Sequence, residues 1–341
     1  MGDVAMTPEK ATDPRYAAFA GARVLITGGL GFIGATLARR LVALGSDVLL
    51  VDSLIPEYGG NLFNITDIAD RLTVNISDIR DMYGLRHLLL GREYLFNLAG
   101  QTSHLDSMTD PLVDLEINCR AQLTLLEACR AVNPGINIVF ASTRQIYGRP
   151  DYVPVDEKHI LRPVDVNGVN KMAGEAYHTL YHDVYGMRSC ALRLTNTYGP
   201  RMRIKDARQT FVGVWLRSVI EGRDFEVWGG EPLRDFTYVE DAADAFLLAA
   251  VTPEMAGKAC NIGGHRAISL RALAETLVAV NGGGGFLTRE FPAERKRIDI
   301  GDYYAEDAMF RQLTGWTPQT DLASGLAQSL AFFRTHLSHY L

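Results

Sequence analysis

The sequence is poor in the features that mark secreted, metal-binding and membrane-spanning proteins. Only four cysteines occur in 341 residues (Cys119, Cys129, Cys190, Cys260), and none has CxxC or Cys/His ligand spacing. We therefore expect no disulfide framework and no metal site, and the simpler prediction is reduced thiols in a cytoplasm. No apolar run approaches the roughly 20 residues that cross a bilayer. The first twenty residues lack the basic segment and apolar core of a secretion signal.

The sequence also has no large excess of positive or negative charge. The net charge of −6 arises from 34 basic and 40 acidic residues, without a long run of either kind. Such a distribution favours neither a nucleic-acid partner nor an anionic membrane surface. An apolar fraction of 47% in a chain of this length is enough for a large core. Small-molecule chemistry becomes the better expectation.

Short aliphatic runs alternate with segments of helical spacing from Arg23 onward, which is typical of a parallel, doubly wound α/β sheet of the Rossmann type. The predicted strands are Val24–Thr27, Val48–Val51, Leu72–Ile76, Tyr94–Leu98, Ile136–Ala141 and Ser189–Leu194. We predict a mobile tail over 1–20, a dinucleotide-binding domain over 21–197 and a smaller α/β lid over 198–341. Some strands and helices of this last part are expected to return to the first domain.

Helical periodicity is clearest in a few segments. From Pro111 to Ala131 one stripe carries Leu115, Cys119, Leu123, Leu126 and Ala131, so we expect this helix to pack on the sheet with that stripe. Further helices are expected at 239–251, 270–280 and 322–336, and the glycine run at 281–285 predicts a turn.

A glycine-rich turn follows the first predicted strand. Gly28, Gly31 and Gly34 allow a tight turn and a close approach of a pyrophosphate to a helix that starts near Phe32, with Ile33 beside it. The string also satisfies GxGxxG from Gly29, so the register is ambiguous by one position, and a purely structural glycine turn is the alternative.

The end of the second predicted strand narrows this choice. Asp52 follows the turn by about 20 residues, where a carboxylate accepts hydrogen bonds from both ribose hydroxyls and repels a 2′-phosphate. NAD is therefore favoured over NADP. Asp78 and Ile79 are further candidates for cofactor contact, and so are Leu98 and Ala99. For Asp78 a helix N-cap is an equal alternative.

At this point the chain resembles the extended short-chain dehydrogenase/reductases, which include nucleotide-sugar epimerases and dehydratases. The resemblance runs from about Arg23 to Trp316, and it rests on TGGLGFIG, Asp52, Asp78, Asn97-Leu98-Ala99 and ASTRQIYG in the expected order. It implies that Thr143 hydrogen-bonds the reacting sugar hydroxyl. Dehydratases of the family carry an Asp-Glu pair directly after this threonine. Here Arg144 and Gln145 stand there, which counts against a standard 4,6-dehydratase.

The second half of the chain carries the implied substrate positions. Asn196 occupies the asparagine of RxxNxYGP, which the resemblance assigns to the substrate diphosphate, and Arg234 and Arg297 match the family's two arginine segments. Two arginines suit a pyrophosphate because guanidinium groups bind it bidentately. Trp228 stands where the family places an aromatic beside the nucleobase; a position in the lid core is the equal alternative.

The family's YxxxK pair is altered in this chain. Lys171, Gly168 and Glu175 fall in their usual places, and they put Asn167 at the tyrosine. A phenol can take a hydroxyl proton as hydride leaves, whereas an amide has no comparable proton to give or take. Normal alcohol oxidation then lacks its usual base.

Three hypotheses follow from Asn167, beside simple impairment. Another group supplies the base, namely Lys171, Tyr147, His104 or a water held by Thr143; or the chemistry has become an elimination; or the chain is a catalytically silent nucleotide-binding protein. We favour the first and predict NAD-dependent 4-epimerisation of a nucleotide sugar through a transient keto-sugar. A dehydratase is the alternative enzyme. A homodimer built from 111–131 and 168–185 is implied by the resemblance.

Overall fold

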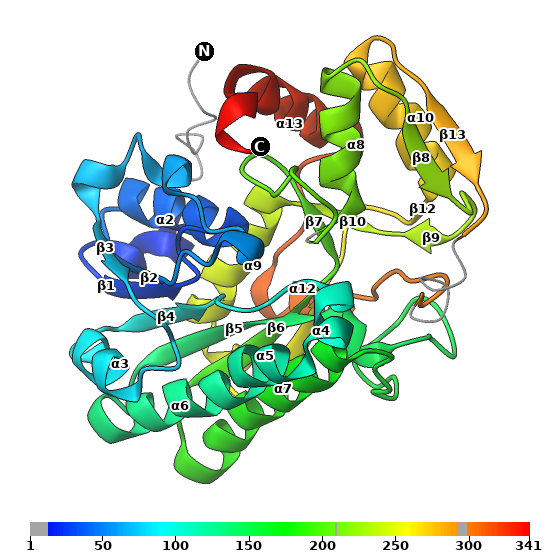
Figure 1. The fold of residues 1–341 in the computed structure, drawn as a ribbon. Helices are drawn as coiled ribbons and strands as arrows, with labels where there is room; N and C mark the ends of the chain where they lie inside the picture. The colour runs from blue at the N-terminus through cyan, green and yellow to red at the C-terminus, as the bar shows by residue number, and fades with distance from the viewer. Residues whose placement is uncertain (1–12, 209, 292–298) are drawn as a thin grey trace.

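A seven-stranded parallel sheet forms the centre of the computed structural model, which describes residues 13–208, 210–291 and 299–341 (Figure 1). The strand order is β11-β6-β5-β4-β1-β2-β3. The bounds are β1 Arg23–Thr27, β2 Asp47–Asp52, β3 Thr73–Ile76, β4 Tyr94–Asn97, β5 Asn137–Thr143, β6 Ser189–Leu194 and β11 Ala259–Ile262. The predicted fold class is confirmed, because all six predicted strands lie in one parallel sheet with helices on both faces.

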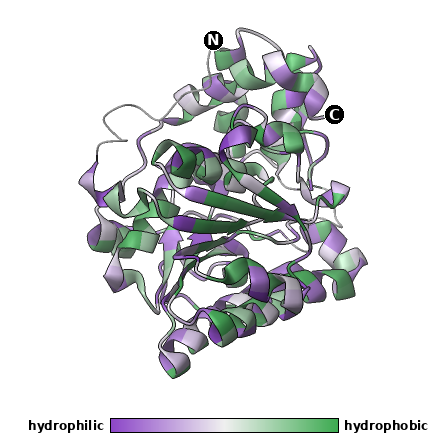
Figure 2. Cartoon of the chain, turned by 90° about the vertical axis from the view of Figure 1, so that its left-hand side faces the viewer, coloured by the Kyte–Doolittle hydropathy of each residue, from purple (hydrophilic) through white to green (hydrophobic). Residues whose placement is uncertain are grey.

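Helices cover both faces because the strands are apolar on both sides, as parallel strands must be when crossovers bury them. The helices are α2 Phe32–Ala43, α3 Met82–Leu89, α4 His104–Thr109, α5 Pro111–Leu115, α6 Ala121–Val132, α7 Val166–Tyr185, α8 Phe211–Ile220, α9 Val239–Val251, α10 Leu270–Asn281, α12 Ala308–Thr314 and α13 Leu322–His336. In Figure 1, α3, α6 and α7 lie on one face of the sheet, and α2 and α9 lie on the other. Figure 2 shows green, hydrophobic strands between helices of mixed hydropathy.

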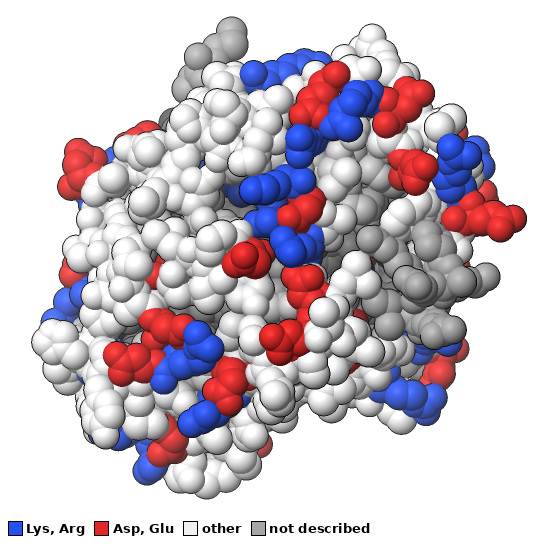
Figure 3. Space-filling view, in the orientation of Figure 1, with Lys and Arg blue, Asp and Glu red and all other residues white. Residues whose placement is uncertain are grey.

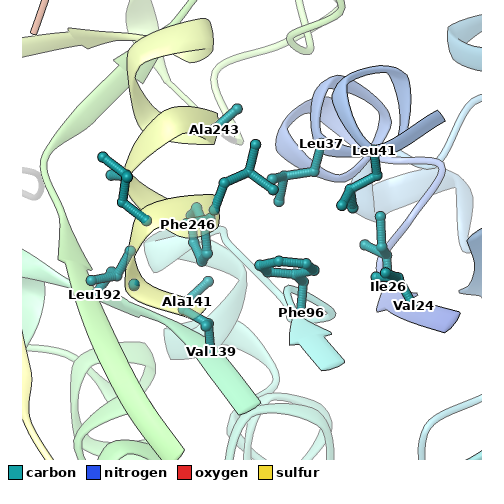
Figure 4. Close-up of a cluster of buried hydrophobic side chains, with 14 of the residues drawn as sticks. Val24, Ile26, Leu37, Leu41, Phe96, Val139, Ala141, Leu192, Ala243 and Phe246 are labelled. Carbon is teal, nitrogen blue, oxygen red and sulfur yellow. The ribbon is translucent and has the colours of Figure 1, made fainter. Parts of the chain in front are cut away.

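The core on the α2 and α9 side is drawn in Figure 4. Phe96 of β4 lies between Leu37 and Leu41 of α2 and Phe246 of α9, and all four side chains are fully buried. Burial of a large apolar side chain contributes about 1.5–3 kcal/mol to folding. This layer therefore fixes α2, whose N-terminus faces the glycine-rich turn.

The segment predicted as one helix from Pro111 to Ala131 contains a π turn at Glu116–Arg120, between α5 and α6. A π turn adds a residue to the turn and so shifts the buried stripe. The predicted stripe is therefore wrong in part. Leu115 is 40% exposed and Ala131 is exposed, whereas the buried stripe of α6 contains Ala121, Leu125, Leu126, Ala128 and Cys129.

The predicted tail over 1–20 is wrong for its last residues. Pro14–Phe19 forms a 3₁₀ helix, whose Tyr16 hydroxyl donates to Asp244 over 3.2 Å. The Phe19 ring is fully buried, with its centroid 4.9 Å from that of Tyr94. Two aromatic side chains in this short segment bury enough apolar area to hold it on the sheet. Residues 1–12 lie outside the described part.

The lid is a second apolar cluster, formed by α8, α10, α13 and the parallel pair β8 (Phe225–Trp228) and β13 (Phe286–Arg289). It lies at the upper right of Figure 1. Short strands link it to the sheet edge: β7 Asn196–Tyr198, β9 Leu233–Arg234, β10 Phe236–Tyr238 and β12 Ile268–Ser269. Within the range expected to be mainly lid, β11 is a strand of the central sheet and α9 packs on that sheet. The domain division itself stays a prediction.

The face of the molecule drawn in Figure 3 has no dominant charge. Figure 3 shows acidic and basic side chains interspersed over the visible face. Among the described residues, no helix is long and apolar enough to span a membrane. The same residues contain no group of three or more His, Cys, Asp and Glu side chains that could hold a metal ion.

Candidate active site

The glycine-rich turn joins β1 to α2 at the carboxyl edge of the sheet. Gly28 has φ +67°, and a Cβ there would lie 2.9 Å from the Ala99 nitrogen; a Cβ on Gly34 would lie 2.2 Å from the Gly28 oxygen. Neither position has room for a side chain. Gly31 caps α2 without a side-chain hydrogen bond. The first N–H groups of α2 thus face a cavity, as a bound pyrophosphate requires.

This cavity, the cofactor cavity, has a volume of about 260 Å³. All the predicted cofactor residues line it: Gly28, Gly31, Phe32, Ile33, Gly34, Asp52, Asp78, Ile79, Leu98, Ala99 and Lys171. The Asp52 carboxylate accepts from the Leu30 and Leu54 nitrogens over 3.0 and 2.9 Å. Burial raises the pKa of Asp52 above its usual value. The glycine cradle and this carboxylate fit a dinucleotide with free ribose hydroxyls.

The predicted N-cap role of Asp78 is wrong. Asp81 caps α3 by accepting from the Tyr83 nitrogen. Asp78 instead pairs with Arg80 over 2.6 Å, and this arginine holds the pKa of Asp78 below its usual range. Asp78 reaches the wall of the cofactor cavity as an ion-paired carboxylate.

Helix α7 brings Lys171 and Asn167 into the same cavity. The helix begins after Asp165, whose Oδ1 accepts from the Gly168 nitrogen over 2.7 Å. Lys171 Nζ donates to the Ala141 oxygen over 3.1 Å. Burial lowers the pKa of Lys171 to about 8. The amine can therefore lose its proton near neutral pH.

Asn167 belongs to a buried polar cluster around Asp114. Its Nδ2 donates to Asp114 Oδ2 over 3.0 Å and to the Gln101 main-chain oxygen over 2.9 Å. Asn118 and Asn170 also donate to the Asp114 carboxylate, over 3.0 and 2.8 Å. The amide of Asn167 is thus committed to holding a fully buried carboxylate and the loop after β4.

A chain of polar contacts runs across the cavity wall from Thr143. Thr143 Oγ1 accepts from the Gln145 nitrogen over 3.2 Å, and Gln145 Nε2 lies 3.0 Å from His104 Nε2. His104 Nδ1 lies 3.0 Å from Asp165 Oδ2. Burial alone would raise the pKa of Asp165, but His104, the Gly168 N–H and the charge of Arg144 together lower it. Asp165 is therefore a carboxylate at neutral pH.

A second cavity, the lid cavity, has a volume of about 760 Å³ and lies under α8 and β8. Trp228 and Arg234 line it. Five residues line both cavities: His104, Arg144, Gln145, Asn196 and Thr210. A ligand that spans the two cavities would cross this shared wall, directly beside Thr143.

Arginines mark the lid side of the shared wall. Arg144 Nη2 donates to Asn196 Oδ1 over 3.1 Å, and its guanidinium lies 5.3 Å from the centre of the Tyr303 ring. Arg234 Nη2 lies 3.2 Å from Asp299 Oδ1. Burial lowers the pKa of both arginines, that of Arg234 to about 10. Two desolvated guanidinium groups favour an anionic ligand. Arg297, the other predicted arginine, lies outside the described residues.

Tyr147 is wrong as a candidate base. Its hydroxyl donates to Asn261 Oδ1 over 2.7 Å and accepts from Arg193 Nη1 over 2.6 Å, and its side chain is fully buried. It lines neither cavity. Burial raises the pKa of Tyr147 well above its ordinary value. Tyr147 ends the short 3₁₀ helix Arg144–Tyr147 that follows β5, where the local sequence does not decide whether the ring faces the core or the cavity.

The sequence analysis missed Gln101, Asp114 and Asp165. Asp165 had a local signal, because it stands three residues before Gly168 at a helix start, where an aspartate caps the helix. Asp114 had none, since two of its three partners, Asn167 and Asn170, come from α7, more than fifty residues away.

The chain matches the family model described as the NAD dependent epimerase/dehydratase family over residues 24–263. It is 31% identical over 315 residues to a UDP-glucose 4-epimerase of Mycolicibacterium smegmatis, covering 92% of this chain and 98% of that protein.

Two solved structures are similar along almost the whole chain. A UDP-glucose 4-epimerase from Thermotoga maritima with UDP-glucose has a TM-score of 0.83 and 27% identity, covering 92% of this chain and 99% of that one. A dTDP-glucose 4,6-dehydratase from Streptomyces venezuelae with NAD bound has a TM-score of 0.83 and 25% identity, covering 93% and 98%.

The match covers well over half of the chain, and the glycine cradle, Asp52 and Lys171 line one dinucleotide cavity. The chain belongs to the NAD dependent epimerase/dehydratase family and is an NAD-dependent enzyme.

Proposed function

We propose that this enzyme epimerises a nucleotide-diphosphate sugar, at C4, through a transient keto-sugar. The observation that carries the proposal is the shared wall between the two cavities, which puts Thr143 beside the point where a ligand in the lid cavity would meet the cofactor cavity. Relatives and solved neighbours named as UDP-glucose 4-epimerases support the substrate class.

In this proposal the residues of the two cavities have different roles, according to where they lie. Arg144, Asn196 and Arg234 supply the polar wall for the diphosphate and sugar, and Trp228 offers a ring at the lid. Thr143 hydrogen-bonds the reacting hydroxyl, and Asp52 would accept hydrogen bonds from a cofactor ribose. Lys171 lines the cofactor cavity. NAD held there would supply an acceptor and donor of hydride, so that no net oxidation results.

Asn167 stands at the family's tyrosine position in this proposal. Its amide holds Gln101 and Asp114 and offers no titratable proton. The proton of the sugar hydroxyl must therefore pass to another group, and the burial of Tyr147 and its contacts with Asn261 and Arg193 argue against this tyrosine.

Dehydration of the sugar is the second candidate, and one neighbour is named as a dTDP-glucose 4,6-dehydratase. Arg144 and Gln145 lie in the shared wall and provide no carboxylate for protonating a leaving hydroxyl. This favours epimerisation. A silent nucleotide-binding protein is the remaining alternative.

The test is incubation of the NAD-loaded enzyme with UDP-, dTDP-, GDP- and CDP-hexoses. NMR of the products should show a 4-epimer of unchanged mass, and the absorbance of bound NADH should rise transiently. Loss of one water would show a dehydratase instead. Tight binding of a nucleotide sugar with neither product nor NADH would overturn the proposal. It would support the catalytically silent nucleotide-binding protein instead.

We also propose a cytoplasmic homodimer. Apolar side chains on α5 and α7 are exposed in the single chain: Leu112, Leu115, Val169, Leu180, Val184 and Tyr185. Exposed apolar side chains gathered on neighbouring helices mark a protein interface. The four cysteines are free, which suits a reducing compartment.

A further inference from the structure

We propose that His104, oriented by Asp165, is the acid/base group that exchanges the proton of the reacting sugar hydroxyl. This inference rests on the proposed function, because it needs a sugar hydroxyl beside Thr143. His104 is the first residue of α4, and its side chain is 32% exposed in the wall that both cavities share. It is the only histidine lining either cavity in the described part of the chain.

Asp165 fixes how the imidazole stands. Its side chain is only 2% exposed; Oδ1 is held by the Gly168 nitrogen at 2.7 Å, and Oδ2 lies 3.0 Å from His104 Nδ1. His104 Nδ1 makes no hydrogen bond as the ring stands, and a small turn of the ring would let an Nδ1–H donate to this carboxylate, which only accepts. In that tautomer Nε2 carries the lone pair, and it lies 3.0 Å from the Gln145 amide in the shared wall. A buried carboxylate that orients an imidazole in this way is the arrangement of a general base.

Gln145 is placed to respond to the proton. Its Nε2 lies 3.0 Å from His104 Nε2 and can donate to the neutral ring. Its buried Oε1 has no hydrogen-bond partner among the described residues. Rotation of the amide by half a turn would bring this oxygen to the protonated ring as an acceptor. The amide can thus contact either protonation state of His104 between turnovers, and the sugar hydroxyl displaces it from Nε2 for the proton transfer.

The proton transfer is balanced by the cofactor. The hydroxyl O–H proton passes to His104 Nε2, the C–H hydride passes to bound NAD, and the carbon becomes a ketone. After the keto-sugar turns its other face, hydride returns to the carbon and His104 returns the proton to the oxygen. The other charges at this place are Arg144 in the shared wall and the Asp106–Arg208 ion pair of 2.7 Å at the lid cavity. The Lys171 amine is held by the Ala141 oxygen on the cofactor side.

The test compares His104→Gln and Asp165→Asn with wild type, using NAD-loaded enzyme and the nucleotide hexose that wild type turns over. Asp165→Asn keeps a side-chain oxygen for the Gly168 N–H, so the cap of α7 is retained while the carboxylate is lost. His87→Gln, an exposed change on α3, is the matched control. Calorimetry with UDP reports the lid cavity without chemistry, and thermal melts report folding.

We expect His104→Gln to lower kcat about 10²–10⁴-fold, the range of a general base, with unchanged UDP affinity and melting temperature. Asp165→Asn, a change at a positioning residue, should lower kcat less. In His104→Ala, added imidazole should restore turnover in proportion to its neutral fraction, which a merely structural role would not produce.

Full turnover by His104→Gln would overturn the proposed acid/base role of the His104–Asp165 pair, called the dyad below, and leave the proposed function standing. Lost turnover without imidazole rescue would also overturn it, since the side chain would then be structural. A wild-type enzyme that turns over none of the hexoses overturns the proposed function and the dyad together.

Discussion

Asn167 has a structural role that its hydrogen bonds define. Its Nδ2 reaches both Gln101 and the buried Asp114, so the side chain has become part of the scaffold under the cofactor. The positions around it, Gly168 and Lys171, still shape the helix and the cavity. If Asn167 stands at the family's tyrosine position, as proposed above, another group must handle the proton.

Asp52 should decide the choice of cofactor. Asp52→Asn keeps an acceptor for one neighbouring backbone N–H but removes the negative charge that binds ribose hydroxyls and repels a 2′-phosphate. We expect NAD affinity to fall about tenfold or more, as when a charged hydrogen bond is lost, and the preference over NADP to shrink. Calorimetry with both cofactors measures this. Asp47→Asn, at the exposed start of the same strand, should change neither affinity.

The buried charge of Lys171 should lower the free energy of unfolding at neutral pH. Burial lowers its pKa to about 8, so between pH 8 and the unfolded value near 10.5 the unfolded chain holds a proton that the folded chain has lost. Stability then rises with pH across this window. Lys171→Met removes the penalty and should raise the free energy of unfolding at pH 7 by about 1–3 kcal/mol.

Denaturant melts from pH 7 to pH 10 test this expectation, and the advantage of Lys171→Met should shrink toward pH 10. Lys258→Met, at an exposed position, is the control and should stay within about 0.5 kcal/mol of wild type. An advantage that is constant with pH would contradict the explanation by desolvation.

At the scale of elements, α7 carries Asn167 and Lys171 and is tied to the sheet by a buried ion pair. Glu175 Oε1 lies 2.6 Å from Arg193 Nη2 of β6, and Glu175 Oε2 accepts from Ser142 of β5 over 2.5 Å. The pair holds the helix above the two strands whose ends supply Thr143 and the shared wall. Its role is to fix the orientation of α7.

Removing one partner of this buried ion pair should lower the free energy of unfolding strongly. Glu175→Ala leaves the Arg193 charge buried and uncompensated, and we expect a loss of about 3–5 kcal/mol in the free energy of unfolding. Glu116→Ala breaks an exposed pair of 3.1 Å with Arg120 and should cost no more than about 1 kcal/mol. Urea melts compare the two; equal losses would show that the buried pair is not what holds α7.

At the scale of the whole molecule, the cofactor cavity and the lid cavity share one wall, and the proposed reaction takes place at this wall. The face of α5 and α7 lies on the far side of the sheet from α2 and α9, on the outside of the molecule (Figure 1). Association through this face leaves the lid free.

Disrupting this face should separate the proposed dimer. Leu180→Arg puts a charge at a side chain that is 48% exposed in the single chain, and light scattering should then give the mass of a monomer. Leu287→Arg changes a leucine of similar exposure, 47%, on β13 of the lid and should leave the dimer intact. A wild-type protein that is monomeric would contradict the proposal.

The sequence by itself determined the order of strands and helices, the glycine turn and the position of Asp52. These depend on periodicity and on backbone conformations that local sequence dictates, as at Gly28, whose positive φ excludes most side chains. Family-like spacing also identified Lys171 and the departure at Asn167.

Tertiary structure alone decided which polar groups meet. His104 begins α4 and Asp165 caps α7, and nothing in their local sequences indicates the 3.0 Å contact between them. Packing between distant segments likewise decided three further features. These are the π turn in the Pro111–Ala131 segment, the burial of Tyr147 in the core, and the burial of Tyr16 and Phe19 against the sheet. Local pattern fixes elements, whereas the partners of a buried polar group depend on how those elements pack.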